Sequence, residues 1–200
     1  MSNRFIIVLL LAFNVTAMAQ GYDKEQDNHR RNYILQFVDA YKKSYQIMDI
    51  DYIETLFGED ALIITEGNKI AKAKDSNIFN NIRVDDKNEY ERVIEDKEQY
   101  LSRLRKVFKD NQAIRLSIAN LKIHPHINYP EIYGLSFLQT WKSMEDSTLL
   151  LEDNCPGYIF MMIDFKNGDD CPIIHVRTWQ PQNHIKDSSD IYNLYDFIIL

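Results

Sequence analysis

The stretch that decides the fold is Gly157-Tyr-Ile-Phe-Met-Met-Ile-Asp-Phe165, which is followed by Lys166-Asn-Gly-Asp169 and then by Pro172-Ile-Ile-His-Val-Arg-Thr-Trp179. Two apolar runs flank an Asn-Gly pair. This pattern predicts a β-hairpin, because both central residues of a type I′ turn need a positive φ. We therefore place the turn at Asn167 and Gly168, within a region of three long strands that spans residues 131–181.

The turn sets the register of the predicted hairpin. Phe160 then lies opposite His175, and Tyr158 lies opposite Arg177. Because side chains alternate between the two faces of a strand, the hairpin has two chemically different faces. One face is almost wholly apolar and is expected in the core: Ile159, Met161, Ile163, Phe165, Ile174, Val176 and Thr178. The other, which we call the mixed face, combines aromatic and ionisable side chains: Tyr158, Phe160, Met162, Asp164, Cys171, Ile173, His175, Arg177 and Trp179.

The first 19 residues have the pattern of a signal peptide. Arg4 precedes the apolar run from Phe5 to Phe13, and Ala17-Met-Ala19 supplies small residues where a signal peptidase cleaves. The run is shorter than the roughly 20 residues that span a bilayer. No cysteine lies near the cleavage point, which argues against a lipoprotein. We expect a soluble mature chain, exported to the periplasm or the extracellular space.

The size and charge of the remaining chain limit the number of domains and the classes of partner. Residues 20–200 have the usual length of one domain, and we expect a single domain with a short C-terminal tail over 182–200. The net charge of −7 argues against binding to nucleic acid or to an anionic membrane surface, because both require clustered positive charge.

The two cysteines are predicted to be free thiols, each partly buried. In the predicted register Cys155 faces position 180, nine residues along the strand from Cys171, or roughly 30 Å at the usual rise per residue. A disulfide needs Cα atoms within about 7 Å of each other.

Three helices are predicted in the first half of the chain. Apolar residues recur at helical spacing from Tyr33 to Met48, in a helix that begins near Asp27. A short helix runs from Asp51 to Phe57, and Asp96 caps a third helix, with Gln99 completing a capping box. A strand at 61–65, a polar insert at 66–95 and a sheet that starts at Ile114 complete an α+β arrangement with the helices on one sheet face.

Five patches of this sequence resemble exported bacterial proteins of the nuclear transport factor two-like superfamily, whose members are also described as SnoaL-like or cystatin-like. The patches are Ala61-Leu-Ile-Ile64, Tyr100-Leu-Ser-Arg-Leu-Arg-Lys-Val-Phe108, Ile132-Tyr-Gly-Leu135, Gly157-Tyr-Ile-Phe160 and Val176-Arg-Thr-Trp-Gln-Pro181. The resemblance implies a cone-shaped fold, in which a curved antiparallel sheet packs against three helices of the N-terminal half, often in a dimer. The superfamily includes enzymes and non-catalytic binding modules, so function stays open.

No pattern for catalysis or metal binding is recognisable. His124-Pro-His126 contains a proline that interrupts a strand, and no third ligand stands at a metal-binding spacing. The chain has no Gly-x-Ser-x-Gly motif, and its six glycines form no phosphate-binding loop. We therefore assign no catalytic residue, no metal and no cofactor.

Two functions remain open from the sequence. The first is a non-catalytic module whose mixed face binds a protein partner or a second copy. The second is a small-molecule enzyme, of an acid–base isomerase or hydrolase type, with a pocket between sheet and helices. The candidate binding residues for ligand or partner are Trp141, Tyr158, Phe160, His175, Arg177 and Trp179, because aromatic and arginine side chains dominate recognition surfaces.

The signal-peptide interpretation predicts a mature N-terminus at Gln20. N-terminal sequencing of protein recovered from an exporting host should read Gln20-Gly-Tyr-Asp. A retained Met1, or a lipid on the mature chain, would contradict the interpretation.

Overall fold

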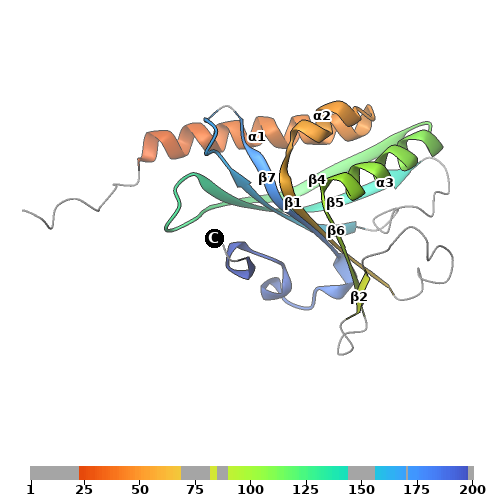
Figure 1. The fold of residues 1–200 in the computed structure, drawn as a ribbon. Helices are drawn as coiled ribbons and strands as arrows, with labels where there is room; N and C mark the ends of the chain where they lie inside the picture. The colour runs from red at the N-terminus through yellow and green to blue at the C-terminus, as the bar shows by residue number, and fades with distance from the viewer. Residues whose placement is uncertain (1–22, 69–81, 85–89, 144–155, 170, 198–200) are drawn as a thin grey trace, which may run out of the picture.

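A computed structural model describes residues 23–68, 82–84, 90–143, 156–169 and 171–197 (Figure 1). The signal-peptide residues and Cys155 lie outside these ranges. The helices are α1 (Lys24–Gln46), α2 (Ile50–Thr55) and α3 (Lys97–Asp110). The strands are β1 (Phe57–Asn68), β2 (Ile82–Val84), β3 (Tyr90–Glu95), β4 (Ile114–Pro125), β5 (Ile132–Ser143), β6 (Pro156–Asp164) and β7 (Ile173–Pro181). Short 3-10 turns follow at η2 (Gln182–His184), η3 (Ser188–Asp190) and η4 (Leu194–Asp196).

Aspartate side chains begin all three helices. Asp23 accepts hydrogen bonds from the backbone N–H groups of Glu25 and Gln26 at the start of α1. Asp49 caps α2, so this helix begins just before the predicted Asp51. The predicted capping box of Asp96 and Gln99 begins α3 and is confirmed. These caps satisfy backbone donors that have no partner within the helix, so each helix starts where its aspartate stands.

The strands form one sheet in the order β2-β3-β1-β7-β6-β5-β4. β4 to β7 pair antiparallel with their sequence neighbours, as predicted. β1 pairs with β7 in parallel, so the sheet is mixed rather than wholly antiparallel. Figure 1 shows all three helices on one side of the curved sheet and the C-terminal tail on the other. The predicted α+β class is confirmed.

The main core lies between the helices and the inner face of the sheet. Helix α1 contributes a buried stripe that includes Ile34, Phe37 and Tyr41, and α3 contributes Leu101 and Leu104. Inner-face residues of β5 and β6 complete the core: Leu135, Phe137, Ile159, Met161 and Ile163. Burial of this apolar surface stabilises the fold by roughly 25 cal/mol per Å².

The predicted register of β6 and β7 is wrong. Phe160 pairs with Thr178 instead of His175, and Tyr158 pairs with Gln180 instead of Arg177. The connection is longer than a two-residue turn, because β6 ends at Asp164 and β7 begins only at Ile173. The register also shifts at a bulge near His175. Beyond the bulge, the observed pairing differs from the predicted pairing by an odd number of residues. These residues of β7 therefore lie on the opposite sheet face from the one predicted.

The mixed face is therefore only half correct. Tyr158, Phe160 and Met162 lie on the outer face as predicted, but Arg177 and Trp179 lie on the inner face, where each is at most 1% exposed. Val176 and Thr178, predicted for the core, lie on the outer face instead. Trp141 is also an inner residue, packed edge-on against Tyr45 with ring centroids 5.5 Å apart.

Two further features of the described residues bear on the sequence predictions. Cys171 is a free thiol, as predicted, but it is exposed rather than partly buried. None of the helices in the described ranges is long and apolar enough to cross a membrane.

Gly157 gives a direct test of the observed β6–β7 packing. A Cβ atom at this position would stand 2.2 Å from Nε1 of Trp179. Because neither the strand backbone nor the buried indole can move freely, we expect Gly157→Ala to lower the free energy of unfolding by about 1 to 3 kcal/mol. Urea denaturation measures the change. Ser117→Ala, on the exposed side of β4, is the control and should stay within about 0.5 kcal/mol of the parent.

Candidate functional sites

The inner face of the sheet surrounds a buried arginine. Arg177 is 0% exposed; its Nε donates a hydrogen bond to the Tyr41 hydroxyl at 3.2 Å, and its guanidinium lies 5.5 Å from the ring centroid of Tyr100. The hydroxyls of Tyr45 and Tyr100 are 2.7 Å apart. Burial raises the pKa of Tyr45 well above its usual value, so this phenol stays protonated. Aromatic and hydrogen-bonding groups thus fill the interior around this cation.

The outer face of the sheet carries a second apolar cluster. Ile132, Phe160, Met162 and Val176 are buried there although they point away from the helices, and the tail residue Leu194 packs against them. Residues 182–197, which we call the tail, follow β7 and lie over this face (Figure 1). Without the tail, this sheet face would expose a contiguous apolar patch.

The absence of a side chain at Gly134 leaves the space that Leu194 occupies. A Cβ atom on Gly134 of β5 would stand 2.8 Å from Cγ of Leu194 and 3.0 Å from the ring of Phe160. Only the missing side chain lets Leu194 approach the strand so closely. The ring of Phe197 then stacks on Phe160, with centroids 5.5 Å apart and the planes parallel within 1°.

Polar contacts hold the tail at its other points. The Gln180 side chain donates to the carbonyl of Asp190 and accepts from the backbone N–H of Tyr192. The Tyr192 hydroxyl donates to Glu66 at 3.1 Å, and Arg92 lies over the Tyr192 ring. Burial, followed by the Glu66 carboxylate, raises the pKa of Tyr192 to about 12. The tail is therefore an ordered part of the fold that is bound through both apolar and polar contacts.

Two pockets remain open between the tail and the outer sheet face. They have volumes of about 540 Å³ and about 550 Å³, and they share Lys122, Ser136, Ser188 and Ile191 as lining residues. We call them together the outer groove. Phe160 and Leu194 line one pocket, and Tyr158 lines the other. The outer groove thus combines an apolar floor with a polar rim.

His175 is on the outer face but at the end of the sheet nearest the β6–β7 connection. Its Nε2 lies 3.1 Å from Asp164 Oδ2, and its Nδ1 lies 3.5 Å from Asp60 Oδ1. The ring is thus flanked by carboxylates and does not line the outer groove. Among the described residues, no group of three or more His, Cys, Asp or Glu side chains is placed to hold a metal ion.

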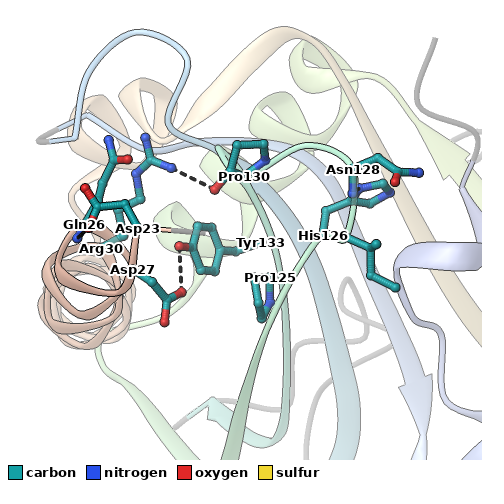
Figure 2. A pocket seen from close by; sticks show the side chains of 10 residues that line it. Asp23, Gln26, Asp27, Arg30, Pro125, His126, Asn128, Pro130 and Tyr133 are labelled. Carbon is teal, nitrogen blue, oxygen red and sulfur yellow. Dashed lines mark hydrogen bonds between the residues drawn. The ribbon is translucent and has the colours of Figure 1, made fainter. Parts of the chain in front are cut away.

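A third pocket, of about 430 Å³, lies where the start of α1 faces the β4–β5 connection (Figure 2). We call it the end pocket. Its lining residues are Asp23, Gln26, Asp27, Arg30, Pro125, His126, Ile127, Asn128, Pro130 and Tyr133. His126 belongs to this pocket whereas His124 lines the outer groove, so the two histidines of the His-Pro-His segment serve different sites.

Asp27 and Arg30, two charged groups of the end pocket, are already paired. Asp27 is buried and accepts hydrogen bonds from the Tyr133 hydroxyl at 2.9 Å and from Arg31 Nε at 2.7 Å. Arg30 donates to Asp169 and to the carbonyl of Pro130, each at 2.7 Å. The hydrogen bond from Arg30 holds the pKa of Asp169 below its usual value. Burial and the bond to Asp27 raise the pKa of Tyr133, so its proton is held firmly.

This arrangement suits binding better than acid–base catalysis. A general base needs a free lone pair near the substrate, and a general acid needs a pKa near the working pH. Asp27 is engaged in an ion pair with Arg31 and in a hydrogen bond with Tyr133, and the raised pKa of Tyr133 opposes proton release. The end pocket therefore offers a fixed, preorganised surface.

The sequence singled out part of this geometry and missed the rest. Phe160 and Tyr158 line the outer groove, His175 lies apart from it, and the other three candidates, Trp141, Arg177 and Trp179, are interior residues. Asp27, Arg30 and Tyr133 were not predicted as a group, although Asp27 and Arg31 stand at the i, i+4 spacing of a helical ion pair. No comparable local signal connects Tyr133 or Asp169 with them.

The arrangement of helices and sheet matches solved structures although no family model and no curated protein matches the sequence. An NTF2-like protein from Cytophaga hutchinsonii superposes with a TM-score of 0.51 at 14% identity, over 76% of this chain and 97% of the other. The chain has the NTF2-like fold. The sequence resemblance is thus confirmed at the level of fold.

Two other structures show how varied the proteins with this fold are. A naphthalene 1,2-dioxygenase structure, with indole bound in its active site, matches with a TM-score of 0.54 at 12% identity, over 83% of each chain. Bd1075 from Bdellovibrio bacteriovorus matches with a TM-score of 0.53 at 13% identity, over 80% of this chain but only 43% of Bd1075. The NTF2-like fold is therefore found in an enzyme and within a longer protein, and it assigns no activity by itself.

The raised pKa of Tyr192 predicts how the stability of the tail changes at alkaline pH. Its pKa is about 12 in the folded protein against an ordinary value of 10.0, so its contribution to stability is complete below pH 10 and is lost as the pH rises through about 12. Tyrosinate absorbance at 295 nm, compared between the parent and Tyr192→Phe, should isolate one phenol that titrates near pH 12. A difference spectrum centred near pH 10 would show that Tyr192 is not held against Glu66.

Proposed function

We propose that the protein is an exported, non-catalytic interaction module that acts through the outer groove. The observation that carries the proposal is the groove itself, an apolar depression between the sheet and the tail that the chain leaves open. Export rests on the signal-peptide pattern of residues 1–19. The sequence allowed a protein partner or a second copy of the chain as the occupant, and the surface around the groove favours a second copy.

A symmetric dimer requires one surface to carry both a projection and a complementary depression, because the same patch meets itself across the twofold axis. Tyr195 meets the first requirement. It lines the outer groove, yet its side chain is 75% exposed and projects from the tail. The pocket of about 540 Å³, which Tyr195 itself lines, meets the second requirement. Insertion of Tyr195 from each copy into the groove of the other would bury both tyrosines.

The rim of the groove also fits a twofold contact. Lys122, Lys186 and Asp187 all line one of its pockets, so both signs of charge are present on one small surface. A twofold axis can bring opposite charges together from the two copies, which sets their relative orientation. The net charge of −7 acts against self-association, so the contact depends on apolar burial at the centre.

The enzyme alternative has less support from the described residues. An interior pocket between sheet and helices would expose polar side chains, whereas Tyr41, Tyr45 and Arg177 are at most 1% exposed. The end pocket does lie between α1 and the sheet, but its carboxylate and phenol are engaged with one another. These observations favour binding over catalysis.

Sedimentation velocity over a range of concentrations tests the dimer. We expect a reversible monomer–dimer equilibrium, and we expect Tyr195→Ala to weaken dimerisation by at least about tenfold, which corresponds to the loss of about 1.4 kcal/mol. Ser136→Phe should weaken it similarly, because Ser136 lines both pockets of the groove and a larger ring would fill the space that the partner's tyrosine needs.

The matched control is Tyr52→Ala, because Tyr52 is an exposed tyrosine on α2, away from the outer groove. It should leave the dimerisation constant unchanged. A chain that stays monomeric at about 100 µM, a concentration that populates a dimer with a micromolar Kd, would rule out the second copy as occupant. An equal effect of Tyr52→Ala and Tyr195→Ala would place the interface elsewhere.

A further inference from the structure

We propose that the end pocket binds a small, neutral, hydroxyl-rich molecule of the sugar or polyol class. This site is separate from the outer groove, and the inference does not depend on dimerisation. The volume of about 430 Å³ lies within the range of small-molecule sites in proteins. The lining residues favour some ligand classes over others, because an anionic, a cationic or a neutral ligand each needs a different kind of pocket group that protein partners do not already occupy.

An anionic ligand is disfavoured. The start of a helix often binds anions through its free N–H groups, but here Asp23 accepts from the N–H groups of Glu25 and Gln26 and places a negative charge beside them. The Arg30 guanidinium is held by Asp169 and by the Pro130 carbonyl. An added carboxylate or phosphate would compete with these partners and would face Asp23 and Asp27.

A cationic ligand is disfavoured for a matching reason. Asp27 is the buried carboxylate of the pocket, and it already accepts from Arg31 and Tyr133. Asp23 is exposed, and Arg30 lies in the same lining. A ligand ammonium group would therefore meet a guanidinium and one screened carboxylate, and an exposed ion pair contributes only about 0 to 1 kcal/mol.

The groups that remain for a ligand are neutral. Within the described residues, the Asn128 side chain makes no hydrogen bond, and Gln26 uses only its amide nitrogen, at 3.4 Å from Asp169. His126 accepts the backbone N–H groups of Asn128 and Tyr129 at Nδ1, which requires the tautomer with the proton on Nε2. A hydroxyl group both donates and accepts, so it matches this mixture of amides and imidazole.

The walls of the pocket suit the carbon framework of a sugar. Tyr133 lies between Pro125 and Pro130 in Figure 2, but it is only 1% exposed. The two proline rings, which are accessible, therefore supply the apolar surface for C–H groups. Tyr133 is fixed by its bond to Asp27 and by an edge-on contact with Phe165 at 5.6 Å. Arg30 lies over the same Phe165 ring at 5.5 Å. A wall that is rigid before binding loses little entropy when the ligand arrives.

Saturation-transfer NMR on the full-length mature chain provides the test. The neutral probes are glucose, galactose, N-acetylglucosamine and myo-inositol; glucosamine and glucuronate carry a related ring with a positive or a negative charge. We expect at least one neutral probe to bind with a Kd below about 10 mM, and more tightly than both charged probes. Absence of binding by every neutral probe at about 50 mM, or preferential binding of a charged probe, would overturn the inference.

Two variants assign the binding to the end pocket. Asn128→Ala and Gln26→Ala each remove one exposed amide, and each should weaken binding of the neutral probe about three- to tenfold, as expected for one hydrogen bond. Both should retain the parent's melting temperature, because neither side chain is buried. Tyr52→Ala, on α2, is the control and should bind the probe as the parent does. Unchanged affinity in both amide variants would place the ligand elsewhere and overturn the inference.

Discussion

The structure depends on one constraint: strand β6 is apolar on both of its faces. Ile159 and Met161 point toward the helices, while Phe160 and Met162 point the other way, and all four are buried. Such a strand needs other parts of the chain packed on both of its faces, because apolar surface left in water costs roughly 25 cal/mol per Å². The helices pack on one face, and the tail packs on the other. The tail is therefore part of the domain's packing, and the outer groove lies between the tail and the sheet.

Local patterns in the sequence predicted most of the helices and strands correctly. The wrong predictions arose where residues far apart in the sequence determine the structure. The capping residues Asp96 and Gln99 and the alternation along β6 act within a few positions, so the sequence alone located α3 and assigned the faces of β6. The register of β7 depends on a long connection and on the bulge near His175, which no local pattern reveals. The single odd offset moved Arg177 and Trp179 from the predicted binding face into the core. The end pocket was missed for the same reason, because its members come from positions as distant as Asp27 and Tyr133.

The interior shows why a shared fold does not carry a shared activity. Arg177 is a buried charge, and the contacts that compensate it include the Tyr41 hydroxyl and the Tyr100 ring. A buried charge held in this way favours one packing arrangement, because any rearrangement that removed its partners would leave the charge uncompensated. Around Arg177, side chains thus fill the interior, and the pockets formed by the described residues at the start of α1 and along the tail lie outside it.

The residues that form the main core and the residues that shape the outer groove lie in different parts of the sequence. The helices and the inner sheet face specify the fold, whereas Tyr192, Leu194 and Tyr195 shape one wall of the outer groove and belong to the last segment of the sequence. Leu194 is buried in the outer apolar cluster, whereas Tyr195 is 75% exposed, so these neighbouring positions carry different constraints. Substitutions at exposed positions such as Tyr195 can reshape the groove wall while Leu194 keeps the tail packed on the sheet. Recognition can therefore change at such positions at little cost to folding.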